Sequence, residues 1–403
     1  MIMEKLKTTV ANEDLIKNSM KYQFTIPVYK TEKIKASIVF LSLFLSYISA
    51  YSNTVFFRKS GFQPVAQQKD TVAPVTREEI KKAMERVYLD KGPKPGSVPK
   101  PVMEIIEKVK QPDHERWYIK YLVDKGEYAY AYILLPLNMQ KGKKLPLVMC
   151  PHPTSDIGKD RVVGIYKEPA KDEKDQIKRE NRQYALELVR RGYIAFAPDR
   201  AAYGERRRHN GGYKTEMPAL QKELSAKYPG WTINGKVIYD LKKALDFLTE
   251  LDFVDSSNIA TIGHSLGAWD SIFLIAFDER VKAAVVNSGG MMNYRPELWK
   301  SEKALRAYLQ DTTKKKGINN DVNIFFMLAA PRSVLYQYSL FDTGNKGGKQ
   351  LIEGFRDVTD YYKKVNKSNK ADVNYYLHGY GHDFTIESRE LAYTWLDRRL
   401  KQK

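Results

Sequence analysis

The 403-residue sequence contains a single cysteine, Cys150, and only six histidines. One cysteine excludes an intrachain disulfide and any metal site built from several thiolates. Because Cys150 closes the apolar run 145–150, we expect it to be a buried strand residue. Histidine is scarce too, so an imidazole base must come from a short list: His114, His152, His209, His264, His378 and His382.

The sequence also lacks an apolar run long enough for a comfortable membrane span. Its clearest apolar run, 36–48, follows Lys33-Ile34-Lys35 and precedes Ser49-Ala50, a pattern typical of a secretory signal. We therefore expect a secreted or periplasmic protein, with an uncleaved membrane anchor formed by about residues 33–52 as the alternative. No cysteine follows the run, which excludes a bacterial lipid anchor. A start at Met20 would give a signal of more ordinary length.

Nucleic-acid motifs are missing as well, despite a net charge of +19. Short basic clusters occur at Arg206-Arg207-Arg208 and Lys314-Lys315-Lys316, without an aromatic-interleaved basic helix or an RNA-binding motif. We expect a solvated basic surface and no nucleic-acid partner, with attraction to a polyanion such as an acidic polysaccharide as the alternative.

The hydrophobic pattern divides the chain into three parts. Residues 1–52 form a lead and signal or anchor segment, and 53–115 a linker and helical extension that begins with the capping box Thr76–Glu79. From 116 to 403 we expect one α/β domain, in which two strands joined by Asp124-Lys125-Gly126 precede repeated strand–helix units. This pattern predicts a mostly parallel sheet flanked by helices, with strands at 145–150, 193–197, 258–262, 281–286, 333–338 and 373–377.

The stretch 258–269, N-I-A-T-I-G-H-S-L-G-A-W, organises the rest of this domain. A strand ends in the G-x-S-x-G motif around Ser265, and an apolar helix begins at once, which is the context of a nucleophile elbow. The sharp turn lifts the serine hydroxyl clear of the sheet, and its crowded neighbours must be small. Ser265 is therefore the predicted nucleophile.

A serine nucleophile needs a base and an orienting acid, which this fold class supplies in the order Ser, Asp or Glu, His, each after a strand. The loop after strand 373–377 offers His378 and His382, and we favour His382 because His378 lies at the very end of the strand. Asp342, just beyond strand 333–338, is the favoured acid. Its competitors Asp357 and Asp360 fall on the polar face of a helix at 349–365.

Stabilising an oxyanion takes two backbone N–H donors. The elbow predicts Leu266 as one, and the loop after strand 145–150 should supply the other. Pro153 has no N–H, so Thr154 is the predicted donor, with Ser155 as the alternative. His152 precedes the serine, is the wrong base for this order, and is expected to shape this loop.

Taken together, these motifs resemble the α/β-hydrolase superfamily, within it the dienelactone hydrolase, acetyl xylan esterase and prolyl oligopeptidase-like group. The resemblance implies the α/β-hydrolase fold with loop or lid insertions, and it departs at His152-Pro153, where the family usually has His-Gly. Leu266 and Asp342 argue against a glucuronoyl esterase, which carries an arginine after the nucleophile and often a glutamate acid. The resemblance rests on segments 197–206 (A-P-D-R-A-A-Y-G-E-R), 240–248 (D-L-K-K-A-L-D-F-L), 258–268, 277–283 (F-D-E-R-V-K-A), 330–335 (A-P-R-S-V-L) and 379–384 (G-Y-G-H-D-F).

Pocket residues are harder to predict. Glu205 and Arg206, after strand 193–197, could line the pocket with His152, or could form a structural salt bridge with Asp199. The insertions 155–180 and 289–325 are expected to form its walls or a lid. Sugar-stacking faces could come from Trp231, Trp269 and Trp299, although Trp269 suits core packing better.

The functional hypothesis is therefore a secreted serine carboxylic-ester hydrolase acting through an acyl-enzyme. It would use Ser265, His382 and Asp342 without a metal or cofactor, on a small-molecule or oligosaccharide ester, by resemblance an acetylated carbohydrate. One alternative is a serine peptidase or amidase of the prolyl oligopeptidase-like type, and a second is a catalytically silent binding protein. The sequence does not predict an oligomeric state, and membrane association is expected only through the N-terminal segment.

Overall fold

The computed structural model describes residues 75–137, 139–209, 211–289, 301–310, 322–342, 348–366 and 372–401. The chain divides into two units, residues 1–69 and 70–403, and every described residue belongs to the second. The predicted signal segment, Trp299 and the basic cluster at 314–316 lie outside the described residues. Within the described ranges, no helix has the length and apolar character needed to cross a membrane.

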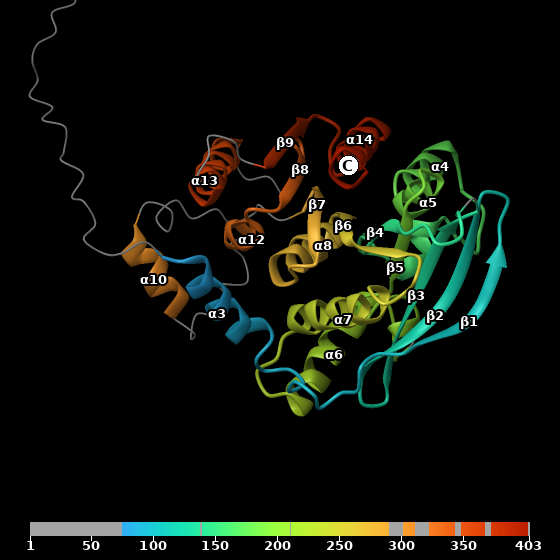
Figure 1. The fold of residues 1–403 in the computed structure, drawn as a ribbon, viewed down its shortest axis with the longest axis horizontal. Coiled ribbons are helices and arrows are strands. Elements are labelled where there is room, and N and C mark those ends of the chain that lie inside the picture. The colour runs from blue at the N-terminus through green and yellow to red at the C-terminus, as the bar shows by residue number, and fades with distance from the viewer. Residues whose placement is uncertain are drawn as a thin grey trace, which may run out of the picture. The chain divides into compact units, whose positions relative to one another are not determined.

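Among the described residues, nine strands form one sheet in the order β1-β2-β3-β5-β4-β6-β7-β8-β9 (Figure 1). The strands β1 to β3 form an antiparallel meander that joins β5 antiparallel, and all other neighbours pair in parallel. This confirms the predicted mostly parallel sheet. The strands are β1 (Met103–Lys110), β2 (His114–Asp124), β3 (Glu127–Pro136), β4 (Leu145–Met149), β5 (Ile194–Pro198), β6 (Val254–His264), β7 (Val281–Asn287), β8 (Ser333–Ser339) and β9 (Val373–His378).

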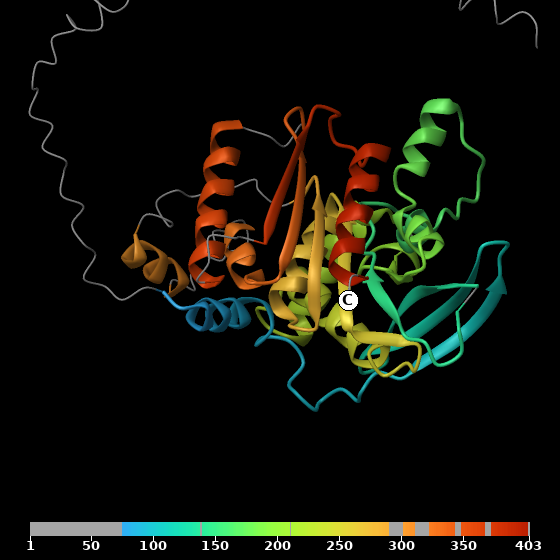
Figure 2. The ribbon, with the colours of Figure 1, turned by 45° about the horizontal axis from the view of Figure 1, so that its top comes forward.

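Helices cover both faces of the sheet, and Figures 1 and 2 show them on either side of the line of strands. One apolar cluster lies between the sheet and α3 (Arg77–Tyr88), α7 (Ile233–Leu248), α8 (Leu266–Phe277), α12 (Val322–Ala329) and α13 (Gly348–Asn366). A second cluster lies under η1 (Gly158–Val163), α5 (Tyr184–Arg190) and α14 (Ile386–Leu400). The other helices are α4 (Glu173–Glu180), η2 (Gly204–Arg206), α6 (Tyr213–Lys227) and α10 (Glu302–Gln310).

Strand composition follows from this two-sided cover. In β4, Leu147 and Met149 pack into the first cluster and Val148 into the second, so the strand reads as a continuous apolar run. Cys150, directly after β4, is fully buried in the second cluster, as predicted. The meander is covered on one face only, so β3 alternates buried Ala129 and Ala131 with more accessible tyrosines.

The start of the sheet differs from the expected organisation. Strand β1 pairs with β2 although it falls within the segment 53–115, which was expected to be a linker and helical extension. It is an edge strand, exposed along most of its length, and its sequence M-E-I-I-E-K-V-K shows no alternation of apolar and polar residues. The predicted capping box of α3 is present, because Thr76 Oγ1 accepts from Glu79 N–H at 3.2 Å and Glu79 Oε2 accepts from Thr76 N–H at 2.8 Å.

Candidate active site

Ser265 lies at the turn between β6 and α8, with φ 56° and ψ −116°, a strained conformation for a residue with a side chain. Its N–H donates to the carbonyl of Asn287, the last residue of β7, at 2.9 Å. A Cβ on Gly263 would come within 2.1 Å of Gly267 O, and one on Gly267 within 2.2 Å of Pro151 O. The close approaches explain the two glycines of the motif, and they hold the serine at the end of its strand.

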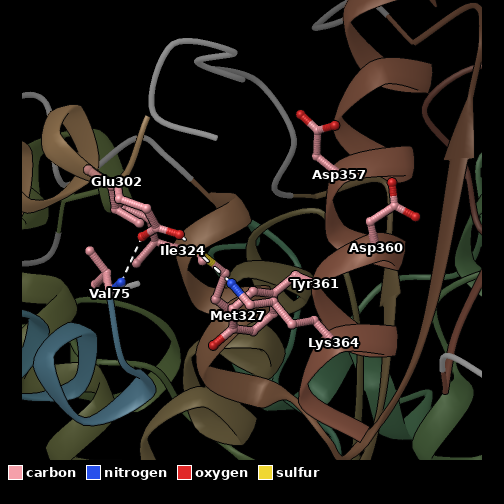
Figure 3. Close-up of a pocket in the computed structure, with 9 residues that line it drawn as sticks. Val75, Glu302, Ile324, Met327, Asp357, Asp360, Tyr361 and Lys364 are labelled. Carbon is pink, nitrogen blue, oxygen red and sulfur yellow. Dashed lines mark hydrogen bonds and ion pairs between the residues drawn. The ribbon is translucent and has the colours of Figure 1, made fainter. Parts of the chain in front are cut away.

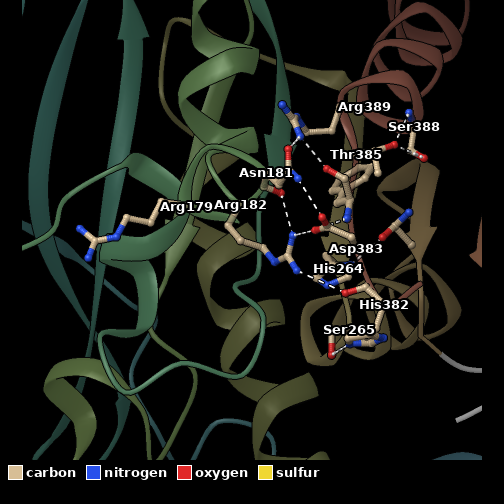
Figure 4. Close-up of polar contacts among 12 residues, drawn as sticks. Arg179, Asn181, Arg182, His264, Ser265, His382, Asp383, Thr385, Ser388 and Arg389 are labelled. Atoms are coloured by element: carbon tan, nitrogen blue, oxygen red, sulfur yellow. Dashed lines mark hydrogen bonds and ion pairs between the residues drawn. The ribbon is translucent and has the colours of Figure 1, made fainter. Parts of the chain in front are cut away.

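Two further loops bring an imidazole and a carboxylate to this serine. His382 Nε2 lies 2.9 Å from Ser265 Oγ (Figure 4), and His382 Nδ1 lies 2.7 Å from Asp342 Oδ2. The Asp342 side chain is 5% exposed and that of His382 is 41% exposed. The structure therefore brings all three predicted residues into one hydrogen-bonded chain, which opens to solvent at its serine and imidazole end.

Ser339, the last residue of β8, connects the loops that carry the acid and the imidazole. Its hydroxyl accepts from Phe341 N–H at 3.1 Å and from Gly381 N–H at 2.9 Å, one donor from each loop. Leu340 N–H donates to the carbonyl of His378 at 2.8 Å. These bonds fix the two loops relative to each other, and so fix the spacing between the carboxylate and the imidazole.

A buried arginine ties the imidazole loop to the other side of the site (Figure 4). Arg182, between α4 and α5, forms an ion pair with Asp383, the residue after His382, and its guanidinium also donates to His382 O at 3.5 Å. Asn181 Nδ2 donates to the same carboxylate at 2.8 Å, and Arg389 donates to Asn181 Oδ1 at 2.7 Å. The residues directly after the insertion 155–180 thus hold the backbone around the imidazole.

A second imidazole lies under the first. His264 is 1% exposed, and its ring centroid is 4.9 Å from that of His382. Ser388 O can only accept, so Gln337 Nε2 donates to it at 2.7 Å and Gln337 Oε1 accepts from Asn287 Nδ2 at 3.2 Å. Asn287 Oδ1 is then an acceptor for His264 Nδ1–H at 2.6 Å. Burial lowers the pKa of His264 well below its usual 6.5, so this ring is neutral.

The predicted oxyanion loop packs directly on the elbow. Pro151 O, which lies against Gly267, accepts from Tyr184 O–H at 2.5 Å. His152 Nε2 accepts from Arg200 N–H at 3.1 Å, so its Nδ1 carries the proton and donates to Pro153 O at 2.7 Å. Burial lowers the pKa of His152 to about 4. His152 therefore shapes this loop as a neutral ring.

The two predicted oxyanion donors, Leu266 and Thr154, flank the contact between Pro151 and Gly267. Leu266 is the first residue of α8, so its N–H is among the helix N-terminal donors that have no intrahelical acceptor. Thr154 is exposed in the neighbouring loop, whereas Ser155 is buried. Their donation to an oxyanion remains a prediction.

Glu205 and Arg206 do not form the expected ion pair with Asp199. The buried Arg206 guanidinium instead pairs with Glu127 at 2.7 Å and Asp240 at 2.8 Å, and it donates to the backbone carbonyl of Asp199 at 3.3 Å. Lys159 forms an ion pair with the Asp199 carboxylate at 2.9 Å and a second ion pair with Glu205. The actual partners, Lys159 and Glu127, are distant in sequence. Short sequence separation therefore suggested the wrong ion pair.

The remaining candidate residues from the sequence lie away from this hydrogen-bonded chain or have structural contacts. Asp357 and Asp360, on α13, line a cavity of about 270 Å³ together with Glu302 (Figure 3). His378 Nδ1 accepts from Tyr380 N–H at 3.3 Å, in keeping with a structural role. Trp231 cannot offer a sugar-stacking face, because it is 1% exposed and donates from Nε1 to Tyr88 O at 2.8 Å.

Sequence reasoning missed the residues that hold the site rather than form it. Asp383 was part of the G-Y-G-H-D-F motif, so its position beside His382 was a usable signal. Arg182, Asn287 and Gln337 gave none, because their partners are distant in sequence and meet only in the folded chain.

Comparison with known proteins agrees with this architecture. The profile of the Abhydrolase family matches residues 55–291. YtaP of Bacillus subtilis (strain 168), named as a hydrolase, is 32% identical over 102 residues, which are 25% of this chain and only 31% of YtaP.

Solved structures are similar over most of the chain. A protein of Bacteroides fragilis NCTC 9343 described as an acetyl xylan esterase has a TM-score of 0.59 at 18% identity, covering 80% of this chain and 86% of that one. A glucuronoyl esterase from Solibacter usitatus gives 0.56 at 17% identity, covering 80% and 91%. A CE15 glucuronoyl esterase from Teredinibacter turnerae T7901 gives 0.53 at 17% identity, covering 79% and 83%. These likenesses confirm the predicted α/β-hydrolase fold.

Proposed function

The chain belongs to the Abhydrolase family, and we propose that it is a serine carboxylic-ester hydrolase that acts on acylated, above all acetylated, carbohydrate. The observation that carries this proposal is the hydrogen-bonded chain from Ser265 Oγ through His382 to Asp342. A strained serine, an accessible imidazole and a buried carboxylate in this order are the components of acyl transfer through a covalent intermediate.

The geometry supports a definite proton path. Asp342 accepts from His382 Nδ1–H, so Nε2 is free to accept the proton of Ser265 as Oγ attacks the ester carbonyl. The N–H groups of Leu266 and Thr154 would stabilise the oxyanion. His382 then gives its proton to the departing alcohol, and it later activates the water that releases the acid and frees Ser265.

The substrate class is proposed from the structural neighbours, which are described as acetyl xylan and glucuronoyl esterases. Two residues favour the acetyl ester over the glucuronoyl ester. Leu266 stands where glucuronoyl esterases carry an arginine, and Asp342 where they often carry a glutamate. We further propose that the segment at about 33–52 directs export, which would bring the protein to extracellular polysaccharide.

A fluorophosphonate probe tests the nucleophile. The folded protein should gain one adduct on Ser265, and Ser265→Ala should abolish both labelling and esterase activity. Ser256→Ala, which changes an exposed serine of the same strand β6, is the matched control and should label normally. An unlabelled folded protein would contradict the enzyme proposal, and full activity in Ser265→Ala would contradict the residue assignment.

A substrate panel tests the class. Acetylated xylo-oligosaccharides should be hydrolysed with a higher kcat/KM than methyl glucuronoyl esters and than aminoacyl anilides. A preference for the anilides would replace the proposal with an amidase or peptidase.

A further inference from the structure

A groove of about 470 Å³, here called the hairpin groove, opens beside the β2–β3 hairpin. Its walls come from hairpin residues 124–128 and Tyr130, from residues 205–208 and from α6. Ala131 pairs with Pro198, the last residue of β5, and Tyr130 O accepts from Asp199 N–H at 2.8 Å. The hairpin therefore extends beyond the carboxyl end of β5, which places the groove along the same edge of the sheet as Ser265.

Tyrosines cover the outer face of this hairpin. Tyr118 and Tyr132 are cross-strand partners, and Tyr128 and Tyr130 follow on the same face at two-residue spacing. The rings of Tyr118 and Tyr130 are stacked, with centroids 6.2 Å apart. Tyr128 and Tyr130 line the hairpin groove, and Tyr128 is 42% exposed. Accessible aromatic faces beside hydrogen-bonding side chains suit a ligand with flat apolar faces and hydroxyl edges.

The tyrosine face is held in place from below. Tyr118 O–H donates to Glu205, whose carboxylate also pairs with Lys159. The Lys159 side chain is 1% exposed, and its Nζ lies 5.3 Å from the ring centroid of Tyr118 and 5.0 Å from that of Tyr132. Tyr130, which lines the hairpin groove, stacks on the Tyr118 ring held in this way, so less of its conformational entropy is lost on binding.

Charge balance in the hairpin groove selects among ligands. Five lining side chains are cationic and four are acidic, so their charges nearly cancel. Most of them are paired with each other or with a neighbour: Lys227 with Asp124 at 2.8 Å, Arg206 with Glu127 at 2.7 Å, Arg208 with Glu223, and Glu205 with Lys159. A groove without a strong field of one sign favours an uncharged polyol over a polyanion.

The hairpin groove is connected to the elbow through neighbouring loops. Tyr203, just before Glu205, contacts the ring of His152 with centroids 5.4 Å apart, and the residue before His152, Pro151, packs on Gly267. In the sheet, β6, β4, β5 and β3 are successive neighbours, so three strand spacings, about 14 Å, separate the elbow from the hairpin. A carbohydrate chain a few units long can span that distance.

We infer that the hairpin groove is a distal subsite for the unacylated, neutral part of a carbohydrate chain whose ester lies at Ser265. The inference rests on the proposed function for its link to catalysis, but sugar binding in the groove can be measured without turnover. The tyrosine faces supply the stacking surface, and the paired charged side chains supply hydrogen bonds to hydroxyl groups.

Calorimetric titration of the full-length Ser265→Ala protein with xylohexaose tests binding alone. Binding should be saturable and little changed by 0.5 M NaCl. Each of Tyr128→Ala and Tyr130→Ala should weaken it by about two- to tenfold, the range expected for one lost ring contact. The matched variants Tyr128→Phe and Tyr130→Phe keep the ring and should keep the affinity. Thermal melts establish that the variants are folded. If Tyr130→Ala does not fold, the affinity of Tyr128→Ala, which changes the more exposed ring, decides the test.

Kinetics in the Ser265 background test the link to the ester site. The ratio of kcat/KM for acetylated xylohexaose to that for acetylated xylobiose should fall by about two- to tenfold in each alanine variant. A folded protein that labels at Ser265 but binds no xylohexaose would overturn the subsite and leave the proposed function intact. Equal affinity in the alanine variants, or binding only of an acidic hexagalacturonate that 0.5 M NaCl abolishes, would also overturn it. Absence of labelling at Ser265 would instead overturn the proposed function, while the titration would still decide whether the groove binds sugar.

Discussion

Removing one member of the Arg182–Asp383 ion pair should destabilise the loop that carries His382. The Arg182 side chain is 6% exposed and that of Asp383 is 29% exposed. With Asp383→Leu, the guanidinium keeps the backbone carbonyls of Asn181 at 3.2 Å and His382 at 3.5 Å, and among the residues that the structure describes no other carboxylate forms an ion pair with it. A buried charge that loses its partner costs more than the pair itself contributes.

The expected loss is about 3 kcal/mol of unfolding free energy, at the low end for a broken buried pair because Asp383 is partly exposed. For a unit of this size that lowers Tm by about 4 °C. Burial raises the pKa of Asp383, but Arg182 outweighs burial and leaves that pKa below its usual 3.8. The pair's contribution is therefore complete above about pH 4, and it is lost as the pH falls through the lowered pKa.

A double-mutant cycle measured by thermal unfolding at pH 7 isolates the pair. Arg182→Met with Asp383→Leu should be less destabilised than the sum of the single variants, because the double variant leaves no unpaired charge. Glu390→Leu is the matched control, since it breaks the exposed Arg191–Glu390 pair and should cost less than about 1 kcal/mol. Additive losses, or an Asp383→Leu protein as stable as the control variant, would refute the reasoning.

Three further changes test other parts of the site. Asp342→Asn should lower kcat on 4-nitrophenyl acetate by about 10⁴-fold with unchanged Tm, because an amide no longer fixes the required tautomer; a loss under tenfold would contradict the acid assignment. Between pH 6.5 and 4 the unfolded chain binds a proton that native His152 does not, so this residue alone should lower the unfolding free energy by up to about 3 kcal/mol as the pH is lowered. His152→Gln should remove this share of the slope and leave the share of His264, whose pKa burial also lowers; an unchanged slope would contradict the contribution of His152. Gly267→Ala puts a Cβ 2.2 Å from Pro151 O and should lower kcat about 10²-fold by displacing the oxyanion loop, whereas Gly212→Ala, whose nearest neighbour is 3.4 Å away, should not.

The catalytic candidates were accessible from the sequence because each depends on a local pattern. A parallel strand brings the residues after it to one edge of the sheet, so Ser265, Asp342 and His382 could be identified by position after a strand. Folding then brings the three loops that carry these residues together. The same locality explains the correct capping box at Thr76, whose two hydrogen bonds span three residues.

What the sequence did not reveal depends on partners that are distant along the chain. Arg206 was expected to form a salt bridge with Asp199, seven residues away, but it forms ion pairs with Glu127 and Asp240. Strand β1 escaped detection because an exposed edge strand has no buried face to impose alternation. Ion pairs and edge strands of this kind depend on which surfaces the tertiary structure brings together.

The two imidazoles at the elbow show how such distant partners control chemistry. His382 must become positively charged when it takes the serine proton, and His264 lies 4.9 Å away, centroid to centroid. A second positive charge at that distance would oppose the first by about 3 kcal/mol at an effective dielectric constant of 20, or more than a hundredfold in rate. Burial prevents this, because it lowers the pKa of His264 well below its usual value, and the positive charges of Arg182 and His382 act in the same direction. The amide chain Asn287–Gln337 fixes the tautomer of this neutral ring, since Asn287 Oδ1 accepts from His264 Nδ1–H. His264, the residue before the nucleophile in the G-x-S-x-G motif, thus carries an electrostatic requirement here: burial keeps its ring neutral, and the amides of strands β7 and β8 fix its tautomer.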